Sequence, residues 1–374
     1  MKVYELAKAV DPYVVSMRRY FHENPELSNQ EDKTIERIGQ ELDAMGIRYE
    51  VVPKGGIIGY IEGTKPGKGK TVLLRADCDA LPVLEKKDNL AGPRVCCSKV
   101  DGVMHACGHD GHTAILLGAA KILNEHKDEI AGKIILFFER AEENGGGMPQ
   151  MLAYMDKHGI TADTCYGTHL FAMLESGKIG LITGGTMSTA MGFNITIHGK
   201  GGHGSMPYAS IDPIKPLAEI LLRVTSLMVN RMDTLEPIVV SPCYFHAGTA
   251  DNIIPETAEM RGTIRYFKEE ALDRTLELVE QISRDIAASY DATATLTYSR
   301  GKTIPVDNDA ASIVAAREVV ENIDGLTAIQ APKLMGSDNF ADFVHAFPGF
   351  YCFMGAGFDG PDGSLPNHHP RFTL

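Results

Sequence analysis

The segment Ile134-Ile135-Leu136-Phe137-Phe138 decides the fold class of this chain. It is apolar throughout, as expected for a strand covered on both faces of an α/β sheet, and a helical pattern follows it over residues 148–158. Upstream, the sequence predicts further strands and helices in alternation, namely strands over residues 48–52, 57–62 and 71–76 and helices over residues 31–45 and 111–124. This alternation predicts an α/β fold with a mostly parallel mixed sheet flanked by helices, and a functional site where strands end.

A different rhythm between residues 187 and 300 predicts an inserted second domain. The order of elements there is β-α-β-β-α-β, which is typical of an α+β ferredoxin-like unit whose sheet buries one face under two helices. We therefore expect one domain made of residues 1–186 and 301–374 and a second domain made of residues 187–300.

The composition excludes several classes of protein. Lys and Arg total 36 against 49 Asp and Glu, a net charge of −13 with no basic run, so we expect no nucleic-acid partner. No stretch approaches the roughly 20 apolar residues that span a bilayer, and residues 1–6 lack the apolar core of a signal peptide. Seven cysteines at irregular positions fit a reducing compartment. We expect a cytoplasmic protein with no membrane partner.

The densest group of possible metal ligands lies between residues 104 and 112. Cys107 and His109 are two residues apart, so on an extended segment they point the same way, just before Asp110 can cap a helix that starts at Gly111. Thiolate and imidazole suit zinc and similar divalent ions. The alternative interpretation is that Cys107 is a buried apolar residue and the histidines are surface polar groups.

Glu142 and Glu143 follow the apolar strand as adjacent carboxylates that must point in different directions. One of them can bind a metal while the other accepts a proton from a water that the metal has acidified. Taken alone, two adjacent glutamates are more often a solvated acidic loop.

Other possible ligands also follow predicted strands. Asp77 and Asp79 come at the end of one strand and His169 at the end of another. Because the carboxyl ends of parallel strands share one edge of a sheet, we expect these side chains to meet beside the ligand-rich segment. Near the C-terminus, His368 and His369 offer one more candidate.

Motifs along nearly the whole chain resemble those of the aminoacylase/carboxypeptidase family of dinuclear metallo-amidohydrolases. The branch in question contains hippurate hydrolases, N-acyl-amino-acid amidohydrolases and plant auxin-conjugate hydrolases. The matching motifs occur in the order typical of the family and cover residues 22–27, 75–82, 107–109, 141–143, 199–207, 252–255 and 368–372.

The resemblance implies a site for two divalent metal ions per subunit, of zinc, manganese, cobalt or nickel. It implies that the metal ligands are Cys107, His109, Glu143, His169 and His368. His368 is preferred to its neighbour because the ligand in the family precedes its proline by two positions.

The resemblance also implies the remaining roles. Glu142 is the expected general base, and His203 is the expected catalytic residue that reaches the scissile carbonyl from a lid and dimerisation domain. Asn252 on the same domain is expected to contact the substrate. Asp77 and Asp79 are expected to orient the metal ligands.

Two short motifs depart from the family pattern. Glu139-Arg140 stands where the family usually has Gln-Pro, and Ser337-Asp338-Asn339 stands where it usually has Ser-Glu-Asp. We expect these departures to bear on substrate choice.

The sequence thus predicts a metal-dependent amidohydrolase that cleaves the amide bond of an N-acyl amino acid or a small peptide-like substrate with metal-activated water. The resemblance also implies a homodimer or a higher homo-oligomer. Within the enzyme class, the alternatives are an N-acetyl-diaminopimelate deacetylase and a dipeptidase. The alternative from another class is a catalytically inactive metal- or ligand-binding protein.

Overall fold

A computed structural model describes residues 3–233, 235–301, 303–360, 363 and 365–374. The chain divides into two compact units: the first comprises residues up to Thr186, Asp307–Pro332 and Asn339–Leu374, and the second comprises Met187–Val306 and Lys333–Asp338. The sequence placed Gly301 and Leu334 in the first domain. They group with the second unit because Gly301 N–H donates to Ala190 O and Leu334 forms a parallel bridge with Met187.

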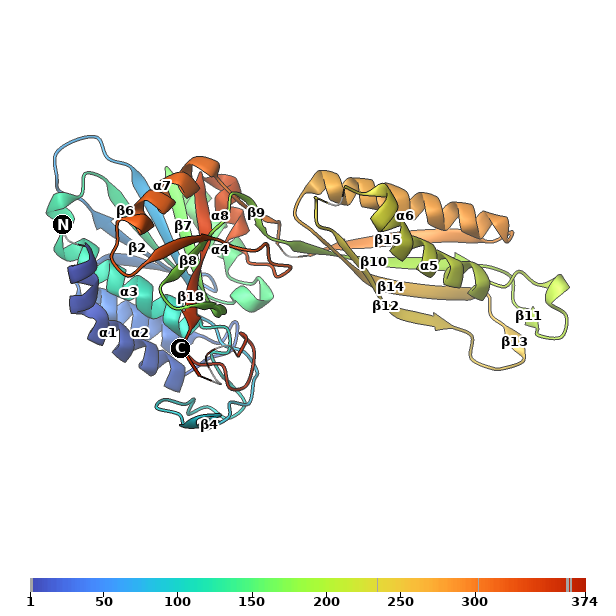
Figure 1. Ribbon diagram of the computed structural model, residues 1–374, viewed down its shortest axis with the longest axis horizontal. Helices are drawn as coiled ribbons and strands as arrows, with labels where there is room; N and C mark the ends of the chain where they lie inside the picture. The colour runs from blue at the N-terminus through green and yellow to red at the C-terminus, as the bar shows by residue number, and fades with distance from the viewer. Residues whose placement is uncertain (1–2, 234, 302, 361–362, 364) are drawn as a thin grey trace. The chain divides into compact units, whose positions relative to one another are not determined.

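The first unit is built on an eight-stranded sheet in the order β1-β2-β6-β3-β7-β18-β8-β17 (Figure 1). Its central strands β6, β3, β7 and β18 run parallel to one another, and antiparallel pairs join β1 to β2, β2 to β6 and β18 to β8. This confirms the mostly parallel mixed sheet. The strand bounds are Arg48–Val52 (β1), Gly56–Glu62 (β2), Thr71–Asp77 (β3), Lys133–Glu139 (β6), Thr164–Glu175 (β7), Lys178–Leu181 (β8), Thr327–Gln330 (β17) and Gly349–Gly357 (β18).

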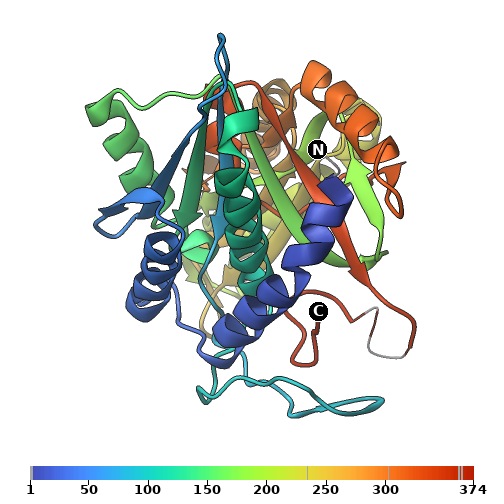
Figure 2. The same cartoon turned by 90° about the vertical axis from the view of Figure 1, so that its left-hand side faces the viewer.

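Helices cover both faces of this sheet. Helices α1 (Val3–Glu23), α2 (Asp32–Ala44) and α3 (His109–Glu125) lie together over one face, as Figure 2 shows in blue and teal. Helix α7 (Ala310–Glu321) packs on β8, β17 and β18, and α4 (Met148–His158) packs beside β1. The short α8 (Ala341–Ala346) covers the face opposite to α1–α3.

Strand β6 has apolar side chains on both faces of the sheet, and helices cover both of these faces. Ile134, Leu136 and Phe138 belong to the core cluster under α1, α2 and α3. Phe137 points to the other face, where its ring lies 4.6 Å from that of Phe343 on α8 in an edge-to-face contact. Each such side chain stabilises the fold by roughly 1.5–3 kcal/mol through the apolar surface it buries. The apolar run in the sequence is therefore a strand with two buried faces, as predicted.

The second unit is a four-stranded antiparallel sheet in the order β12-β14-β10-β15, packed under two helices. The order of elements along the chain is the predicted β-α-β-β-α-β. The bounds are Thr189–His198 (β10), Ile214–Arg231 (α5), Val239–Ala247 (β12), Thr257–Tyr266 (β14), Glu269–Ser289 (α6) and Thr293–Arg300 (β15).

Two local predictions near the site were wrong. Helix α3 begins at His109, after Gly108 with φ 95°, so Asp110 does not cap the helix. Its carboxylate lies inside the first turn and accepts from His22 at 2.8 Å and pairs with Arg18 at 3.0 Å. Strand β7 continues to Glu175, so His169 lies within the strand and not at its end.

Within the described ranges, no helix combines the length and apolar character needed to cross a membrane.

Candidate metal centre

Strand register brings three polar positions to one level of the sheet. Asp77 on β3 lies opposite Glu139 on β6. The pairing of β3 with β7 ends at Arg75 and Gly167, and two residues further along the strands Asp77 is level with His169. Asp77 and Glu139 are thus the last residues of β3 and β6, and His169 lies on β7 where that strand runs on past the end of β3, at the edge of the sheet where ligand sites form in such folds.

The predicted ligands meet around Cys107. Its Sγ lies 3.3 Å from His169 Nε2 and 3.2 Å from His368 Nε2, and His368 Nε2 is 3.5 Å from Glu143 Oε1. Ligand atoms of His109, Glu142 and Glu143 lie within 4.8 Å of one another, as do those of Cys107, His109 and His169. The structure thus brings all five predicted ligands and Glu142 into one cluster.

His169 and His109 are each held by a hydrogen bond at Nδ1, which leaves Nε2 available to a metal. His169 Nδ1 lies 2.7 Å from Leu170 O, and since a carbonyl only accepts, Nδ1 carries the proton and Nε2 turns its lone pair toward Cys107. His109 Nδ1 donates to Asp79 at 3.1 Å, which leaves Nε2 for a metal. Such contacts behind metal-binding histidines fix the ring and its tautomer.

Asp79 connects two of the candidate ligands. Besides the bond from His109, its carboxylate accepts from the backbone N–H of Glu143 at 3.1 Å and from Ser28 Oγ at 2.7 Å. Burial raises the pKa of Asp79, but the hydrogen bond and the charge of His109 outweigh it and the pKa is lowered. Asp79 therefore fixes both an imidazole and the loop that carries the two glutamates.

His112 is a member of the site that sequence reasoning missed. It donates from Nδ1 to Asp77 Oδ1 at 2.6 Å and accepts from the Leu170 N–H at Nε2 at 2.8 Å, so both ring nitrogens are used. The available signal was its spacing of three residues from His109, which puts both on one face of α3.

Burial alone raises the pKa of Asp77, but the charge of Arg75 outweighs it and holds that pKa well below its usual range.

The loop that carries the two glutamates adopts an unusual backbone conformation. Ala141 has φ 54°, a left-handed value that is costly for a residue with a side chain. The buried Glu31 holds this turn, since it accepts from Ala141 N–H at 2.7 Å and from Arg140 Nε at 2.9 Å. Glu31 was not predicted, because nothing in the local sequence relates it to residue 141.

The C-terminal segment is attached to the cluster by backbone contacts. His368 has φ 70° and donates from its N–H to Ala106 O at 2.6 Å. The amide of Asn367 donates to Cys107 O at 2.9 Å and to Leu170 O at 3.1 Å. His369 instead accepts from the Arg371 N–H through Nδ1 at 3.0 Å. Of the two histidines, His368 is therefore the one beside the cluster.

The donor set fits divalent metal ions. Glu143 Oε1 is buried and has no hydrogen-bond partner among the described residues, which marks a site where a cation is expected. Burial raises the pKa of the Cys107 thiol, so its ionised form requires a compensating positive charge nearby. One sulfur, three imidazole nitrogens and carboxylate oxygens are the ligands that zinc and related ions take.

The second unit contains the two other predicted residues. The short strands Gly202–His203 (β11) and Ile253–Ile254 (β13) pair with each other, and Gly204 N–H donates to Asn252 O at 2.8 Å. The exposed imidazole of His203 accepts from the Ser205 N–H at Nδ1 at 3.1 Å. The proton of the neutral ring therefore sits on Nε2, which is free to donate to a ligand.

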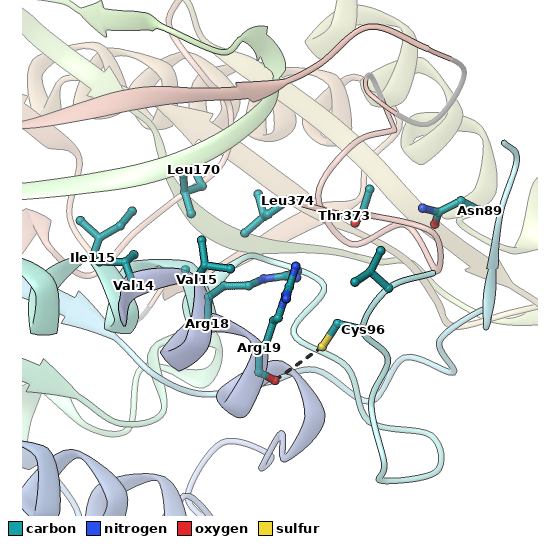
Figure 3. Close-up of a pocket in the computed structure, with 12 residues that line it drawn as sticks. Val14, Val15, Arg18, Arg19, Asn89, Cys96, Ile115, Leu170, Thr373 and Leu374 are labelled. Carbon is teal, nitrogen blue, oxygen red and sulfur yellow. Dashed lines mark hydrogen bonds between the residues drawn. The ribbon is translucent and has the colours of Figure 1, made fainter. Parts of the chain in front are cut away.

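A separate cavity of about 450 Å³ lies between α1, α3 and the C-terminal residues (Figure 3). Val14, Ile115 and Leu374 give it apolar walls, and Arg18 and Arg19 border it. None of the candidate ligands lines it, and it comes near the cluster at Leu170, which follows His169 in β7, and at Gly111 in the first turn of α3.

A mostly parallel sheet that carries these ligands and a spare carboxylate at its carboxyl edge is the arrangement of a metal-dependent hydrolase. The family model described as peptidase family M20/M25/M40 matches residues 73–374. The chain belongs to this family and is an enzyme that acts on amide bonds, as the resemblance implied.

Individual relatives agree with this assignment. The chain is 37% identical to thermostable carboxypeptidase 2 of Saccharolobus solfataricus, over 98% of this chain and 92% of that protein. It is also 37% identical to N-acetylcysteine deacetylase of Bacillus subtilis, over 98% and 93% of the two chains. The crystal structure of the Bacillus subtilis YXEP protein, described as a dinuclear metal binding peptidase of the M20 family, matches with a TM-score of 0.82 and 34% identity over 98% and 93%.

Proposed function

We propose that the protein hydrolyses the amide bond of N-acyl amino acids with two divalent ions held by Cys107, His109, Glu143, His169 and His368. The observation that carries this proposal is the meeting of these five side chains with Glu142 in one cluster. Bound there, the ions would polarise the substrate carbonyl and lower the pKa of water toward about 7.

In this proposal Glu142 is the general base. It accepts the proton of the attacking water and returns it to the leaving amine. Its Oε1 accepts from the backbone N–H of Asn339 at 3.4 Å, and its neighbour Glu143 has an oxygen without a hydrogen-bond partner among the described residues. This contrast supports different roles for the two carboxylates, Glu143 as the ligand and Glu142 as the base.

We further propose that residues 1–186 and 301–374 are the catalytic part and that residues 187–300 act as a lid. His203 would donate from Nε2 to the oxyanion that develops on the scissile carbonyl, a role supported by the hydrogen bond that fixes its tautomer. Asn252 would contact the substrate from the adjoining turn, since it lies beside Gly204.

The same unit is proposed to form a homodimer or higher oligomer. Strand β12 is an edge of its sheet, and Tyr244 and Phe245 on this strand are exposed. Leu222 on α5 is also exposed. An edge strand with large apolar side chains is a surface suited to pairing with a second copy.

The acyl amino acid substrate is supported by the relative whose name is N-acetylcysteine deacetylase. A second candidate, a peptidase that releases an amino acid from a small peptide, is favoured by the similarity to a thermostable carboxypeptidase. Both reactions break an amide next to a free carboxylate, so the same cluster serves either.

The test is metal analysis together with a substrate panel. We expect the purified protein to contain about two divalent ions per chain and to hydrolyse acetyl or benzoyl amino acids faster than dipeptides and acetyl-diaminopimelate. Glu142→Gln should keep its metal and lose about 10²- to 10⁴-fold in kcat. Unchanged turnover in this variant would refute the base assignment, and a fully metal-loaded protein inactive on the whole panel would refute the proposed reaction.

A further inference from the structure

A buried polar network lies directly behind the cluster. It consists of Arg75 and Asp77 on β3, Glu139 at the end of β6 and Asn339 just before α8. Their exposed fractions are 4%, 0%, 0% and 2%, so the network has little contact with solvent. Burying charges to this extent is costly unless each is paired and hydrogen-bonded, so the geometry of the pairing decides whether the network is stable.

The guanidinium of Arg75 is the centre of this network. It donates to Asp77 Oδ2 at 2.6 Å, and through Nε and Nη2 to Glu139 Oε2 at 2.9 and 2.7 Å. Nη2 also donates to Asn339 Oδ1 at 2.6 Å. Asn339 Nδ2 in turn donates to Glu139 Oε1, so Arg75, Glu139 and Asn339 form a closed ring of hydrogen bonds.

The carboxylate and the carboxamide are complementary in this arrangement. The oxygen of Asn339 faces a cation and its NH2 group faces an anion, so the amide has one favourable orientation. A carboxylate at both positions would set two acceptors against each other, and an amide at both would set two donors against each other. An exchanged pair, with the amide at 139 and the carboxylate at 339, would make the same bonds with the same total charge.

These two residues belong to the two short motifs that depart from the family pattern, in which Arg140 and Asp338 are the other departures. Glu139 stands where the family usually has Gln, and Asn339 stands where it usually has Asp. We expect the departures to bear on substrate choice, and the structure shows that both side chains are buried and bonded to Arg75. Relative to that family pattern, acid and amide are exchanged between two side chains that are in direct contact in this structure.

The network also reaches the proposed base and the metal cluster. The backbone N–H of Asn339 donates to Glu142 Oε1, and Asp77 accepts from His112, which is bonded to the β7 backbone beside His169. A displacement of Asn339 would therefore move a donor of Glu142, and a displacement of Arg75 would act on β7 through Asp77 and His112.

We propose that Glu139 and Asn339 form a reciprocal positioning pair that fixes Glu142 for catalysis, an inference that rests on the proposed role of Glu142. The pair does not touch the reacting atoms. It acts through Arg75 and the Asn339 backbone, so its contribution depends on having one acid and one amide and not on which position carries which.

The test is a set of three variants: Glu139→Gln, Asn339→Asp and the double exchange. Each single change leaves a buried donor or acceptor facing its like. We therefore expect each to lower the urea midpoint of the chelator-treated protein and to lower kcat by on the order of tenfold, with KM and metal content little changed. The double exchange should restore both the midpoint and kcat to within a few-fold of the parent.

A matched control separates positioning from loss of stability. Asp309 caps α7 by accepting from the Ser312 N–H at 2.7 Å, in the same unit and outside the network. Asp309→Ala should lower the urea midpoint while leaving kcat unchanged. A double exchange whose urea midpoint and kcat are no higher than those of the worse single variant would overturn the proposal. Single variants that lose stability but keep full kcat would also overturn it.

A failure of the proposed Glu139–Asn339 pair can be distinguished from a failure of the proposed role of Glu142. Unfolding of the chelator-treated variants requires no catalysis, so it judges the Glu139–Asn339 coupling even if Glu142 proves not to be the base. Conversely, the Glu142→Gln variant leaves this coupling intact and judges the reaction alone.

Discussion

The metal cluster of the first unit and the β11–β13 turn of the second unit hold their candidate residues in different ways. His109 is buried and bonded to Asp79, which is itself bonded to two further groups. His203 is exposed and its ring is bonded to Ser205 alone among the described residues. In the cluster, position, charge and stability are therefore coupled, whereas at the turn a side chain can be changed with little effect on the fold.

The largest expected effect is that of metal removal. Treatment with a chelator should abolish turnover, because the proposed cluster supplies both the activation of water and the binding of the carbonyl. Activity should return on addition of zinc, manganese or cobalt, as measured by hydrolysis before and after dialysis. Full activity in protein shown by elemental analysis to be free of metal would contradict the proposal.

At the turn, His203→Ala should lower kcat by about 10²- to 10³-fold, because the donor to the developing oxyanion is lost. The thermal unfolding temperature should stay the same, since the residue is exposed. Steady-state kinetics and calorimetry on the same sample check both statements. A loss of stability as large as that of a cluster variant would remove the contrast between the two regions.

Within the cluster, Asp79→Ala should lower metal affinity by about 10- to 100-fold, because it frees the ring of His109 and the backbone of Glu143 together. Competition with a chromophoric chelator measures this affinity. Asp79→Asn is the matched control, since it keeps an acceptor oxygen for His109, and it should lose less.

A smaller effect is expected for Ser205→Ala at the turn. Its Oγ lies 2.8 Å from His203 Nδ1, but the Ser205 N–H still donates to that atom in the variant. We expect a decrease in kcat of about two- to tenfold, in line with the loss of one exposed neutral hydrogen bond of about 1 kcal/mol. A loss as large as that of His203→Ala would show that the hydroxyl has a role of its own.

The smallest effect concerns Asp309, which lies outside both regions. Its hydrogen bond from the Ser312 N–H lowers the pKa of this carboxyl in the folded state below its ordinary value. The stabilisation is therefore present above the unfolded pKa and is lost as the pH falls through the folded pKa. Asp309→Ala should cost about 1 kcal/mol at pH 7 and much less near pH 2, as measured by urea unfolding at the two values.

The parts of the fold that the sequence predicted share one property, a strong local pattern. The apolar strand β6 and the ligand-rich segment that leads into α3 could be recognised because each is a continuous run of residues with an evident role, although the first residue of α3 was predicted two positions too late. Strands β8 and β17 were missed, since each is four residues long and is defined by pairing with a distant partner.

The same distinction applies to the candidate site. The ligands were predictable as residue types, and Asp77 and Asp79 were named as groups that orient them, while the more distant residues that hold the site were not predictable. Arg75 and Asn339 are 264 residues apart, and Glu31 is 110 residues from the backbone it fixes at Ala141. The left-handed backbone at Ala141 likewise has no local signal, because alanine does not favour that conformation.

The contact between His368 Nε2 and Cys107 Sγ spans 261 positions of the chain. During synthesis, the thiol emerges from the ribosome long before the imidazole, and the whole second unit is made in the interval. Chains grow at about 5–20 residues per second, so the thiol waits for a time on the order of 10–50 seconds. A nascent chain can thus offer only part of the cluster to a passing cation, and complete loading belongs to the last stage of its maturation.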